Sequence, residues 1–299
     1  MSSIQPRVSV IIPTFNHGHL ISRCLESLQA QSIEEWEAIV VNNLSSDDTV
    51  EVVSSFNDKR IKLVNFSNGG VIAAARNHGV KLAQSEYLAF LDSDDIWYPK
   101  KLEAALPILN SGFDIVCHAE KWISKDGLNR MVRYGPNRKT RYENLLFGGN
   151  CLSTSAVMMT RKAFNSAGGF SENHDFITAE DYDLWLKVSR LGCKFFFIDV
   201  ALGEYHLHGG NQSHAAERHH KAVVSVLNSH FSRNVTKSYM NELRKKSRIA
   251  LAASGCARML QANSDFKRAY PWIAKSIREW PFSYKPWAAL FLNAARLRR

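Results

Sequence analysis

The stretch "EYLAFLDSDDIW", residues 86–97, decides the fold of this chain. Its apolar run leads directly into Asp92, Asp94 and Asp95, which is typical of a buried strand that ends in a polar loop. Similar apolar runs that alternate with segments of helical spacing occur at residues 7–13, 36–42, 61–66 and 113–119. Buried strands that alternate with helices predict an α/β fold with a mostly parallel sheet covered by helices on both faces.

The pattern loosens after about residue 120. We expect a hairpin turn at residues 124–129, a strand at 153–160 and a further strand at 193–200. Residues 179–192 have the spacing of a helix, and Gly192 is suited to close it.

The last part of the chain differs in charge. Residues 221–299 hold 16 Lys and Arg against 3 Asp and Glu, a net +13, whereas the remaining residues carry a net −3. Helical spacing dominates from His220 onward, apart from a proline-bounded connector at residues 278–287. We therefore predict two domains, an α/β domain over residues 1–219 and a basic helical region over residues 220–299.

Composition narrows the class of protein. A chain of 299 residues with 45% hydrophobic residues can bury a substantial core. No apolar run reaches about 18 residues, so we expect no transmembrane helix, and we interpret "MSSIQPRVSVII" as leading into the first strand and not as a signal peptide. The cysteines form no CxxC pair and indicate reduced thiols of a cytoplasmic protein: Cys24, Cys117, Cys151, Cys193 and Cys256.

Polar clusters follow four of the predicted strands. They are "PTFN" at residues 13–16, "NNLSSDD" at 42–48, "NFSNGG" at 65–70 and "DSDD" at 92–95. In an open α/β sheet, ligands bind beyond the carboxyl ends of the strands. One polar loop after a strand is commonplace, but four at the same edge predict a binding site.

The pair Asp92 and Asp94 suits a divalent cation. Carboxylate oxygens are hard ligands for Mg²⁺ or Mn²⁺, which keep waters and substrate phosphates as their remaining ligands. The alternative is a loop that caps the helix beginning near Pro99, and for Asp95 alone the two roles are evenly balanced.

Three segments of the chain occur in an order that is typical of one enzyme family: "VSVIIPTFN…IVVNN", "SNGGVIAAARNHG…FLDSDDIWYPKKLE" and "TAEDYDLWLKVSRLG". They resemble the family 2 glycosyltransferases. Members of this family are inverting enzymes of the GT-A fold that use nucleotide-sugar donors. The resemblance covers residues 7–213 and leaves the basic tail outside it. It implies a metal-dependent transfer of a sugar to a saccharide or lipid-linked acceptor in the synthesis of a surface polysaccharide.

The resemblance also implies roles for matching residues. Asp94 would hold the metal and Asp92 would lie near the ribose, while Arg76 would face the base or the diphosphate, unless it is a solvated arginine on a helix surface. The predicted donor-binding residues are Pro13, Thr14, Phe15, Asn43, Ser45, Arg76, Asp92, Ser93 and Asp94.

One position departs from the family. Members commonly carry Asp-Asp or Asp-Asn after the second strand, and here the pair is Asn42 and Asn43, followed by Leu44 where glycine is usual. An amide can still accept or donate a hydrogen bond to a base, but the charge-assisted part is lost. A UDP-sugar remains the expected donor.

The inverting reaction needs a carboxylate that takes the proton of the acceptor hydroxyl. By resemblance this base is Asp181, with Glu180 orienting it or touching the acceptor. The alternative is a capping box in which Asp181 serves the helix that starts after Thr178.

The segment "YHLHGGNQS", residues 205–213, also resembles the family, and it makes His208 a third predicted metal ligand or a contact to the diphosphate. We interpret "HAAERHH", residues 214–220, as a solvated loop and helix start.

The basic tail mixes Lys and Arg with aromatic residues, which fits peripheral attachment to an anionic membrane surface from the cytoplasmic side. The alternative is an ordinary helical subdomain. Nucleic acid is not an expected partner, because the first 220 residues are acidic and carry no nucleic-acid motif. The alternative function is a non-catalytic nucleotide-sugar-binding protein of the same fold.

Overall fold

A computed structural model describes residues 5–124, 129–206, 216–234 and 238–297. The chain divides into two compact units. The first comprises residues 1–142, 151–172 and 184–208, and the second comprises residues 143–150, 173–183 and 209–299. The second unit thus includes two short segments from the middle of the chain that the sequence does not set apart.

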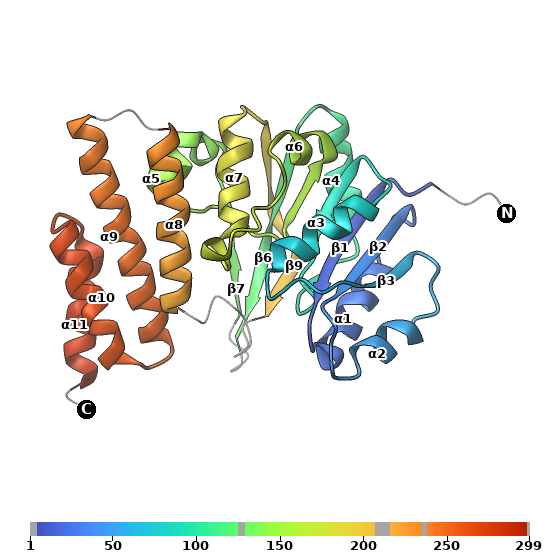
Figure 1. The fold of residues 1–299 in the computed structure, drawn as a ribbon, viewed down its shortest axis with the longest axis horizontal. Helices are drawn as coiled ribbons and strands as arrows, with labels where there is room; N and C mark the ends of the chain where they lie inside the picture. Colours follow the sequence, from blue (N-terminus) through green and yellow to red (C-terminus); the bar gives the residue numbers. More distant parts are fainter. Residues whose placement is uncertain (1–4, 125–128, 207–215, 235–237, 298–299) are drawn as a thin grey trace. The chain divides into compact units, whose positions relative to one another are not determined.

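The first unit is built on one sheet of nine strands among the described residues. The strands are β1 (Val8–Thr14), β2 (Trp36–Asn42), β3 (Ile61–Asn65), β4 (Tyr87–Phe90), β5 (Ile96–Trp97), β6 (Ile115–Ile123), β7 (Asn129–Val132), β8 (Val157–Thr160) and β9 (Phe195–His206). Their order is β3-β2-β1-β4-β8-β6-β9-β5, with β7 paired to β6. The run β3-β2-β1-β4 is parallel throughout, and β8 joins it to the rest by antiparallel pairing. Figure 1 shows β1, β2 and β3 next to one another.

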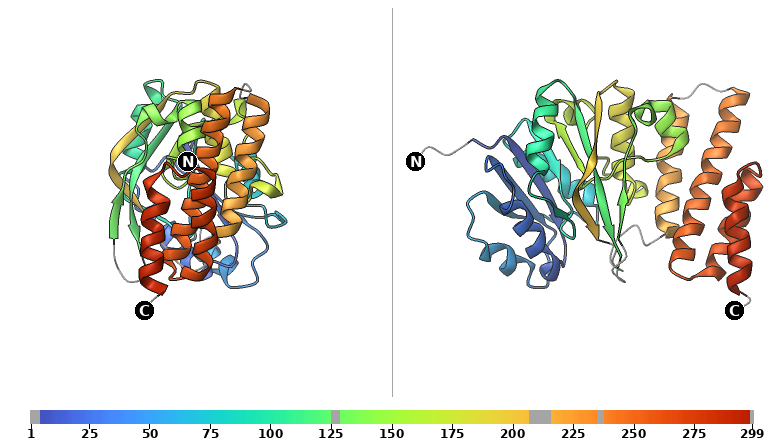
Figure 2. Two further views of the ribbon diagram at one scale, coloured as in Figure 1. Left: turned by 90° about the vertical axis from the view of Figure 1, so that its left-hand side faces the viewer. Right: turned by 180° about the vertical axis from the view of Figure 1, so that it is seen from behind.

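Helices cover both faces of this sheet, which is why β1 and β2 are buried along their whole length. One face packs against α1 (Gly18–Gln29), α2 (Thr49–Ser55) and α4 (Lys101–Asn110). The other face carries α3 (Ile72–Leu82), where a Cβ at Gly79 would lie 2.6 Å from the side chain of Ile11. α3 lies in front of the strands in Figure 1, and α4 lies in front of them in the reverse view of Figure 2.

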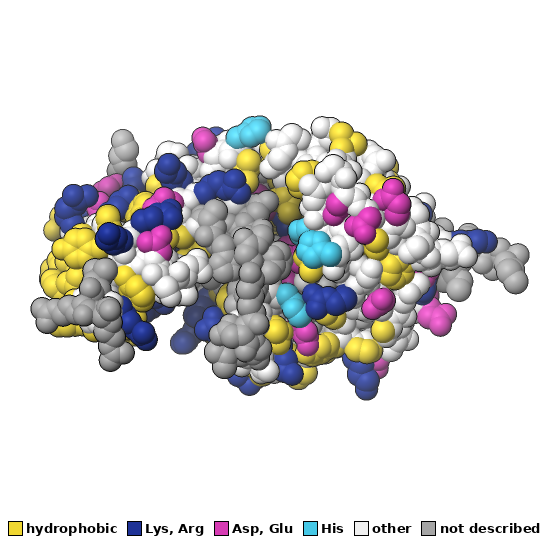
Figure 3. All heavy atoms as spheres, turned by 90° about the horizontal axis from the view of Figure 1, so that it is seen from below, with side chains coloured by type: hydrophobic (Ala, Val, Ile, Leu, Met, Phe, Trp, Pro, Cys, Tyr) yellow, Lys and Arg dark blue, Asp and Glu magenta, His cyan; other side chains and the backbone are white. Residues whose placement is uncertain are grey.

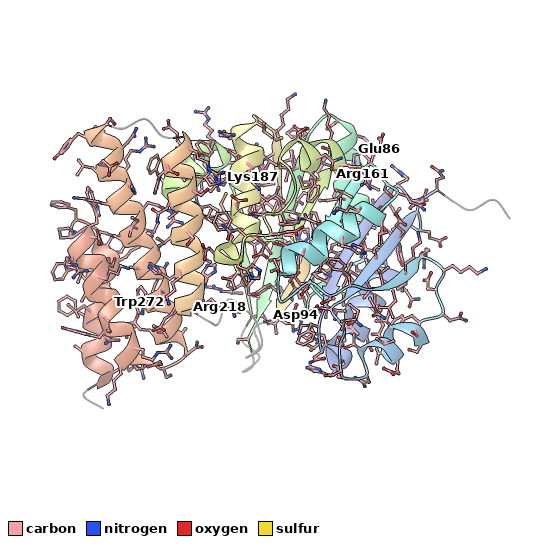
Figure 4. The ribbon with its side chains drawn as sticks, in the orientation of Figure 1. Glu86, Asp94, Arg161, Lys187, Arg218 and Trp272 are labelled. Atoms are coloured by element: carbon pink, nitrogen blue, oxygen red, sulfur yellow. The ribbon has the colours of Figure 1, made fainter. Side chains whose placement is uncertain are left out.

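The register of the parallel strands brings their carboxyl ends to one level. Thr14 pairs with Asn42, and Asn42 in turn pairs with Asn65. The loops that follow β1, β2 and β3 therefore begin side by side. The loop after β4 opens at the same edge, while Glu86 and Arg161 lie at the opposite end of β4 (Figure 4).

Several local predictions change in detail. The predicted strand at residues 153–160 begins only at Val157, and the connector at 278–287 ends where α11 begins at Tyr284. β5 was not expected, since two residues give no periodicity. β6 and β7 pair antiparallel around the predicted hairpin, whose residues 125–128 lie outside the described residues.

The second unit is helical. Its helices are α5 (Tyr142–Gly148), α8 (Ala216–Asn234), α9 (Tyr239–Ala262), α10 (Phe266–Glu279) and α11 (Tyr284–Leu297), together with the first turn of α7 (Glu180–Arg190), which ends in the first unit. Small side chains let α9 and α10 approach closely, as Cys256 and Ala269 share one core cluster and Ala257 and Ile273 another. No helix of the described residues is long and apolar enough to span a bilayer.

The remaining short elements belong to the connections. They are α6 (Arg161–Ser166) after β8 and two 3₁₀ turns, at Asn137–Thr140 and His174–Phe176.

Candidate active site

Hydrogen bonds join the loops that follow β1 and β2. The backbone N–H of Asn43 donates to the carbonyl of Thr14 (3.0 Å), and that of Asn16 donates to Ser45 Oγ (2.9 Å). Asn16 Oδ1 accepts from the N–H of Ser46 at 2.9 Å, and Asn16 adopts a positive φ of 52° that asparagine tolerates. The predicted donor residues Thr14, Asn43 and Ser45 are thus brought together.

The two asparagines after β2 have different surroundings. Asn42 is buried, donates to Asn65 Oδ1 (2.8 Å) and accepts from Ser45 Oγ (2.5 Å). Asn43 is half-buried, and its Oδ1 accepts from the N–H of Asn68 at 2.9 Å. Asn42 therefore holds the edge of the sheet together, and Asn43 is the one whose amide remains partly accessible.

His17, in the loop after β1, contacts the "DSDD" loop of residues 92–95, which we call the carboxylate loop. The sequence alone did not single out His17. Its backbone N–H donates to Thr49 Oγ1 (3.1 Å), and its ring Nδ1 lies 2.7 Å from the hydroxyl of the buried Ser93. His17 directly follows "PTFN", but only the fold shows that it contacts the "DSDD" loop. The hydroxyl of Ser93, a predicted donor-binding residue, therefore has a hydrogen-bond partner within the protein.

Arg76 forms an ion pair with Asp92 in the first unit. Arg76 Nη2 lies 2.7 Å from Asp92 Oδ1, and the two side chains are 3% and 28% exposed. The alternative of a solvated helix-surface arginine is therefore wrong. From α3, the guanidinium stabilises the first carboxylate of the "DSDD" loop, and it also lies over the ring of Phe170 at 5.3 Å.

Ser155 connects two positions of the carboxylate loop. Its hydroxyl donates to Asp95 Oδ2 (2.6 Å) and accepts from the backbone N–H of Asp92 (3.1 Å). Asp95 Oδ1 accepts from the N–H of His206 at 3.2 Å, so the loop is also tied to the end of β9. Burial, followed by the nearby charge of Asp94, raises the pKa of Asp95 well above its usual value.

The helix-capping role considered for Asp95 is wrong, because α4 begins only at Lys101 and Asp95 precedes β5. The three carboxylates of the loop therefore have different surroundings. Asp92 is paired with Arg76, Asp95 is buried, and Asp94, like Asp92, is partly exposed.

Glu120 of β6 is another buried carboxyl group, and the sequence pattern did not predict its burial. Glu120 accepts hydrogen bonds from Tyr134 Oη (2.5 Å) and from Ser153 Oγ (3.3 Å). Burial raises the pKa of Glu120 to about 7. Lys101 is fully buried too, with Nζ 3.1 Å from the centroid of the Trp97 ring, and burial lowers its pKa.

The predicted base and its neighbour lie in the second unit, at the start of α7. Glu180 is buried, and its carboxylate accepts from the backbone N–H of Thr178 at 2.9 Å. Asp181 is half-exposed, accepting from the N–H of Tyr182 (2.6 Å) and from Asn150 Nδ2 (3.3 Å). The residue that reaches back to the backbone is thus Glu180 and not Asp181, so the capping box considered for Asp181 is not formed.

Thr178 adopts a φ of +84°, which is uncommon for a β-branched residue. His219 of α8 holds it, with Nδ1 2.9 Å from the Thr178 carbonyl oxygen. His220 is buried, and its ring packs against Trp272. The interpretation of residues 214–220 as solvated is therefore wrong for these two histidines, which belong to the structure of the second unit.

His208 lies outside the described residues, and so its predicted role as a metal ligand has no geometry here. Within the described residues, no cluster of three or more His, Cys, Asp and Glu side chains could hold a metal ion.

A parallel sheet with polar loops and a carboxylate pair at its carboxyl edge is typical of α/β proteins that bind nucleotides. The family model described as glycosyl transferase family 2 matches residues 9–168. The enzyme WfgD of Escherichia coli, a UDP-Glc:α-D-GlcNAc-diphosphoundecaprenol β-1,3-glucosyltransferase, is 34% identical over 197 residues, which are 63% of this chain and 74% of WfgD. The chain therefore belongs to glycosyl transferase family 2.

Two further proteins are similar over most of this chain. A glycosyltransferase of Rickettsia felis is 28% identical over 280 residues, and the chain spans only 44% of that relative's length. The solved structure of the mannosyltransferase PcManGT from Pyrobaculum calidifontis, in complex with GDP-Man and Mn²⁺, matches with a TM-score of 0.61 at 17% identity, over 97% of this chain and 87% of that one. This likeness confirms the predicted GT-A fold.

Proposed function

We propose that this chain is an inverting, metal-dependent glycosyltransferase that moves a sugar from a nucleotide-sugar donor to a saccharide or lipid-linked acceptor in surface-polysaccharide biosynthesis. The observation that carries the proposal is the carboxylate loop after β4, where Arg76 pairs with Asp92 and Asp94 stays half-exposed. Family membership supports glycosyl transfer, and the name of WfgD supports a UDP-sugar and a diphospholipid-linked acceptor.

The nucleobase would lie against the loops after β1 and β2. Phe15 is half exposed at the end of β1, where a ring can pack against a base, and the buried hydroxyl of Thr14 has no hydrogen-bond partner within the described ranges. Asn43 would contact the base through its amide, since Asn42 is already engaged by Asn65. We propose a uracil base, because a neutral amide can both donate to and accept from its imide edge.

The residues at the carboxylate loop fit a divalent metal. Asp92 and Asp94 offer hard carboxylate oxygens as ligands, which favours Mg²⁺ or Mn²⁺. When bound, such an ion neutralises the charge of the departing diphosphate. The PcManGT complex with Mn²⁺ supports this choice. Arg76 would act mainly by holding Asp92, because its guanidinium is buried in that pair.

The metal proposal has its own test that needs no turnover. Mn²⁺ and UDP together should raise the melting temperature of the protein, because ligands that bind only the folded state stabilise it. Asp94→Asn should abolish the part of this shift that requires Mn²⁺. An undiminished shift would show that Asp94 is not a metal ligand.

We propose Asp181 as the base that takes the proton of the acceptor hydroxyl while this oxygen attacks the anomeric carbon from the face opposite the diphosphate. Its half-exposed carboxylate can be reached by an acceptor, whereas Glu180 is buried and bonded to Thr178. Glu180 would therefore orient Asp181 by fixing the turn that precedes α7. His219 contributes to the same turn from α8.

Asp181→Asn tests the proposed base. The amide cannot accept a proton but can keep the hydrogen bond to Tyr182, so transfer should fall by a factor of about 100 or more while folding and UDP binding persist. Asp183→Asn is the matched control, because this buried neighbour is bonded to His230 at 3.0 Å. It should lower the melting temperature and leave turnover at low temperature largely unchanged.

Near-normal turnover of Asp181→Asn would rule out this base. The alternative of a non-catalytic binder predicts a different result, since the unchanged protein would bind a nucleotide-sugar and neither transfer nor hydrolyse it. A panel of nucleotide-sugars incubated with Mn²⁺, with and without a diphospholipid-linked acceptor, separates the two functions.

A further inference from the structure

The helix α11 exposes a stripe of large apolar side chains. Tyr284, Trp287 and Phe291 follow one another at helical spacing and are 77%, 42% and 76% exposed, and Leu292 adds to the same stripe. The opposite side of the helix, with Ala289 and Asn293, is buried against α9 and α10. α11 is therefore amphipathic with its solvent side apolar, the reverse of an ordinary surface helix.

We call Tyr284, Trp287, Phe291 and Leu292 the α11 stripe. The loop before the helix continues it with Phe282, which is largely exposed and packs edge-on against Trp280. The indole N–H of Trp287 donates to the carbonyl of Pro281 (2.8 Å), so its polar atom is satisfied within the protein. What Trp287 presents to solvent is consequently its apolar ring.

The segment that carries the α11 stripe contains basic residues and no acidic ones. Residues 281–299 contain Lys285, Arg296, Arg298 and Arg299 and no Asp or Glu. Lys285 and Arg296 are exposed on the helix that carries the stripe. Figure 3 shows hydrophobic side chains gathered in the region of the C-terminal helices, with both basic and acidic side chains near them.

We propose that the α11 stripe is a docking surface for a bilayer containing anionic lipid. Exposed aromatic rings flanked by basic residues are suited to the boundary between head groups and acyl chains, where the rings leave water and the cations meet phosphates. A single-stranded nucleic acid would also favour aromatic and basic side chains. Leu292 and the exposed Ala288, however, add apolar surface between the rings, which suits an acyl layer better than separate bases.

The test uses the full chain with vesicles of phosphatidylcholine, alone or mixed with phosphatidylglycerol. The mixed vesicles should bind the protein and release it as salt is added. Phe291→Ser should weaken binding about tenfold, since a buried aromatic side chain is lost. Lys285→Gln should weaken it about fivefold. Val200→Ser, at an exposed apolar residue of β9, is the matched control and should change nothing.

Bromine-labelled acyl chains should quench the fluorescence of Trp287, and Trp287→Phe should remove most of this quenching. Equal binding to vesicles without anionic lipid, or unchanged binding by Phe291→Ser, would overturn the proposal. Two other results would also overturn it. One is a dimer in sedimentation velocity that Phe291→Ser abolishes, and the other is binding of an oligothymidylate that Phe291→Ser abolishes, without any binding of vesicles. UDP binding and transfer to a water-soluble acceptor should be unaffected, so this proposal and the proposed function can fail separately.

Discussion

The pair of Arg76 and Asp92 supports a stability prediction that can be worked from its geometry. The guanidinium is 3% exposed and the carboxylate 28% exposed, with 2.7 Å between Nη2 and Oδ1. A hydrogen bond to a charged group contributes about 1.5–3 kcal/mol, and removing one partner of a buried pair costs about 3–5 kcal/mol. The two single variants should therefore differ, because one partner is far more buried than the other.

Asp92→Ala deprives a buried guanidinium of its carboxylate, so we expect the free energy of unfolding to fall by about 3–4 kcal/mol. Arg76→Met leaves a carboxylate that water can reach, so the expected loss is about 2 kcal/mol. A double-mutant cycle followed by chemical denaturation should give a coupling energy of about 2 kcal/mol.

The matched control is the pair of Arg133 and Asp199, which has a similar distance of 2.6 Å but lies in solvent, with side chains 59% and 76% exposed. Its coupling energy should be below about 1 kcal/mol. The reasoning would be refuted if both cycles gave the same coupling, or if Arg76→Met were more costly than Asp92→Ala.

Three further outcomes follow from the buried groups of the first unit. Ser155→Ala removes two hydrogen bonds of the carboxylate loop and should lower the free energy of unfolding by about 1–3 kcal/mol in thermal melts. Burial raises the pKa of Glu120 from 4.5 to about 7, so between these pH values the folded state retains a proton that the unfolded state releases. The free energy of unfolding should therefore fall by roughly 3 kcal/mol as the pH rises from 4.5 to 7, and Glu120→Gln should lack this fall. Burial also raises the pKa of Cys24 and Cys117, so Ellman's reagent at pH 7 should modify them only after denaturation.

The parallel half of the sheet could be predicted because its strands are buried on both faces. β1 and β2 are mostly apolar, and polar loops follow them directly. Since parallel strands end at one edge, the convergence of the polar loops after them could be predicted directly. β5 could not be predicted, because it consists of two residues whose extended conformation depends on pairing with β9.

The roles of individual polar residues were harder to predict, because they depend on contacts between distant parts of the chain. The sequence left Asp95 between a helix cap and a role in the site, whereas its partner Ser155 is 60 residues away. Arg76 has the sequence context of a surface helix residue, yet it is buried against Asp92. Periodicity shows which side of a helix is apolar, but not that a charged group on it has found a partner.

The carboxylate loop shows how burial can give three identical groups different chemistry. Asp92 is next to a guanidinium that is always charged, so its own charge is compensated within the protein. Burial favours the neutral form of Asp95, whose oxygens are occupied by Ser155 and a backbone N–H. The protein thus limits the net negative charge of a loop that would otherwise repel a diphosphate, while Asp94 stays partly exposed. Under the proposed function, a divalent cation held by this loop would bring positive charge toward the departing diphosphate.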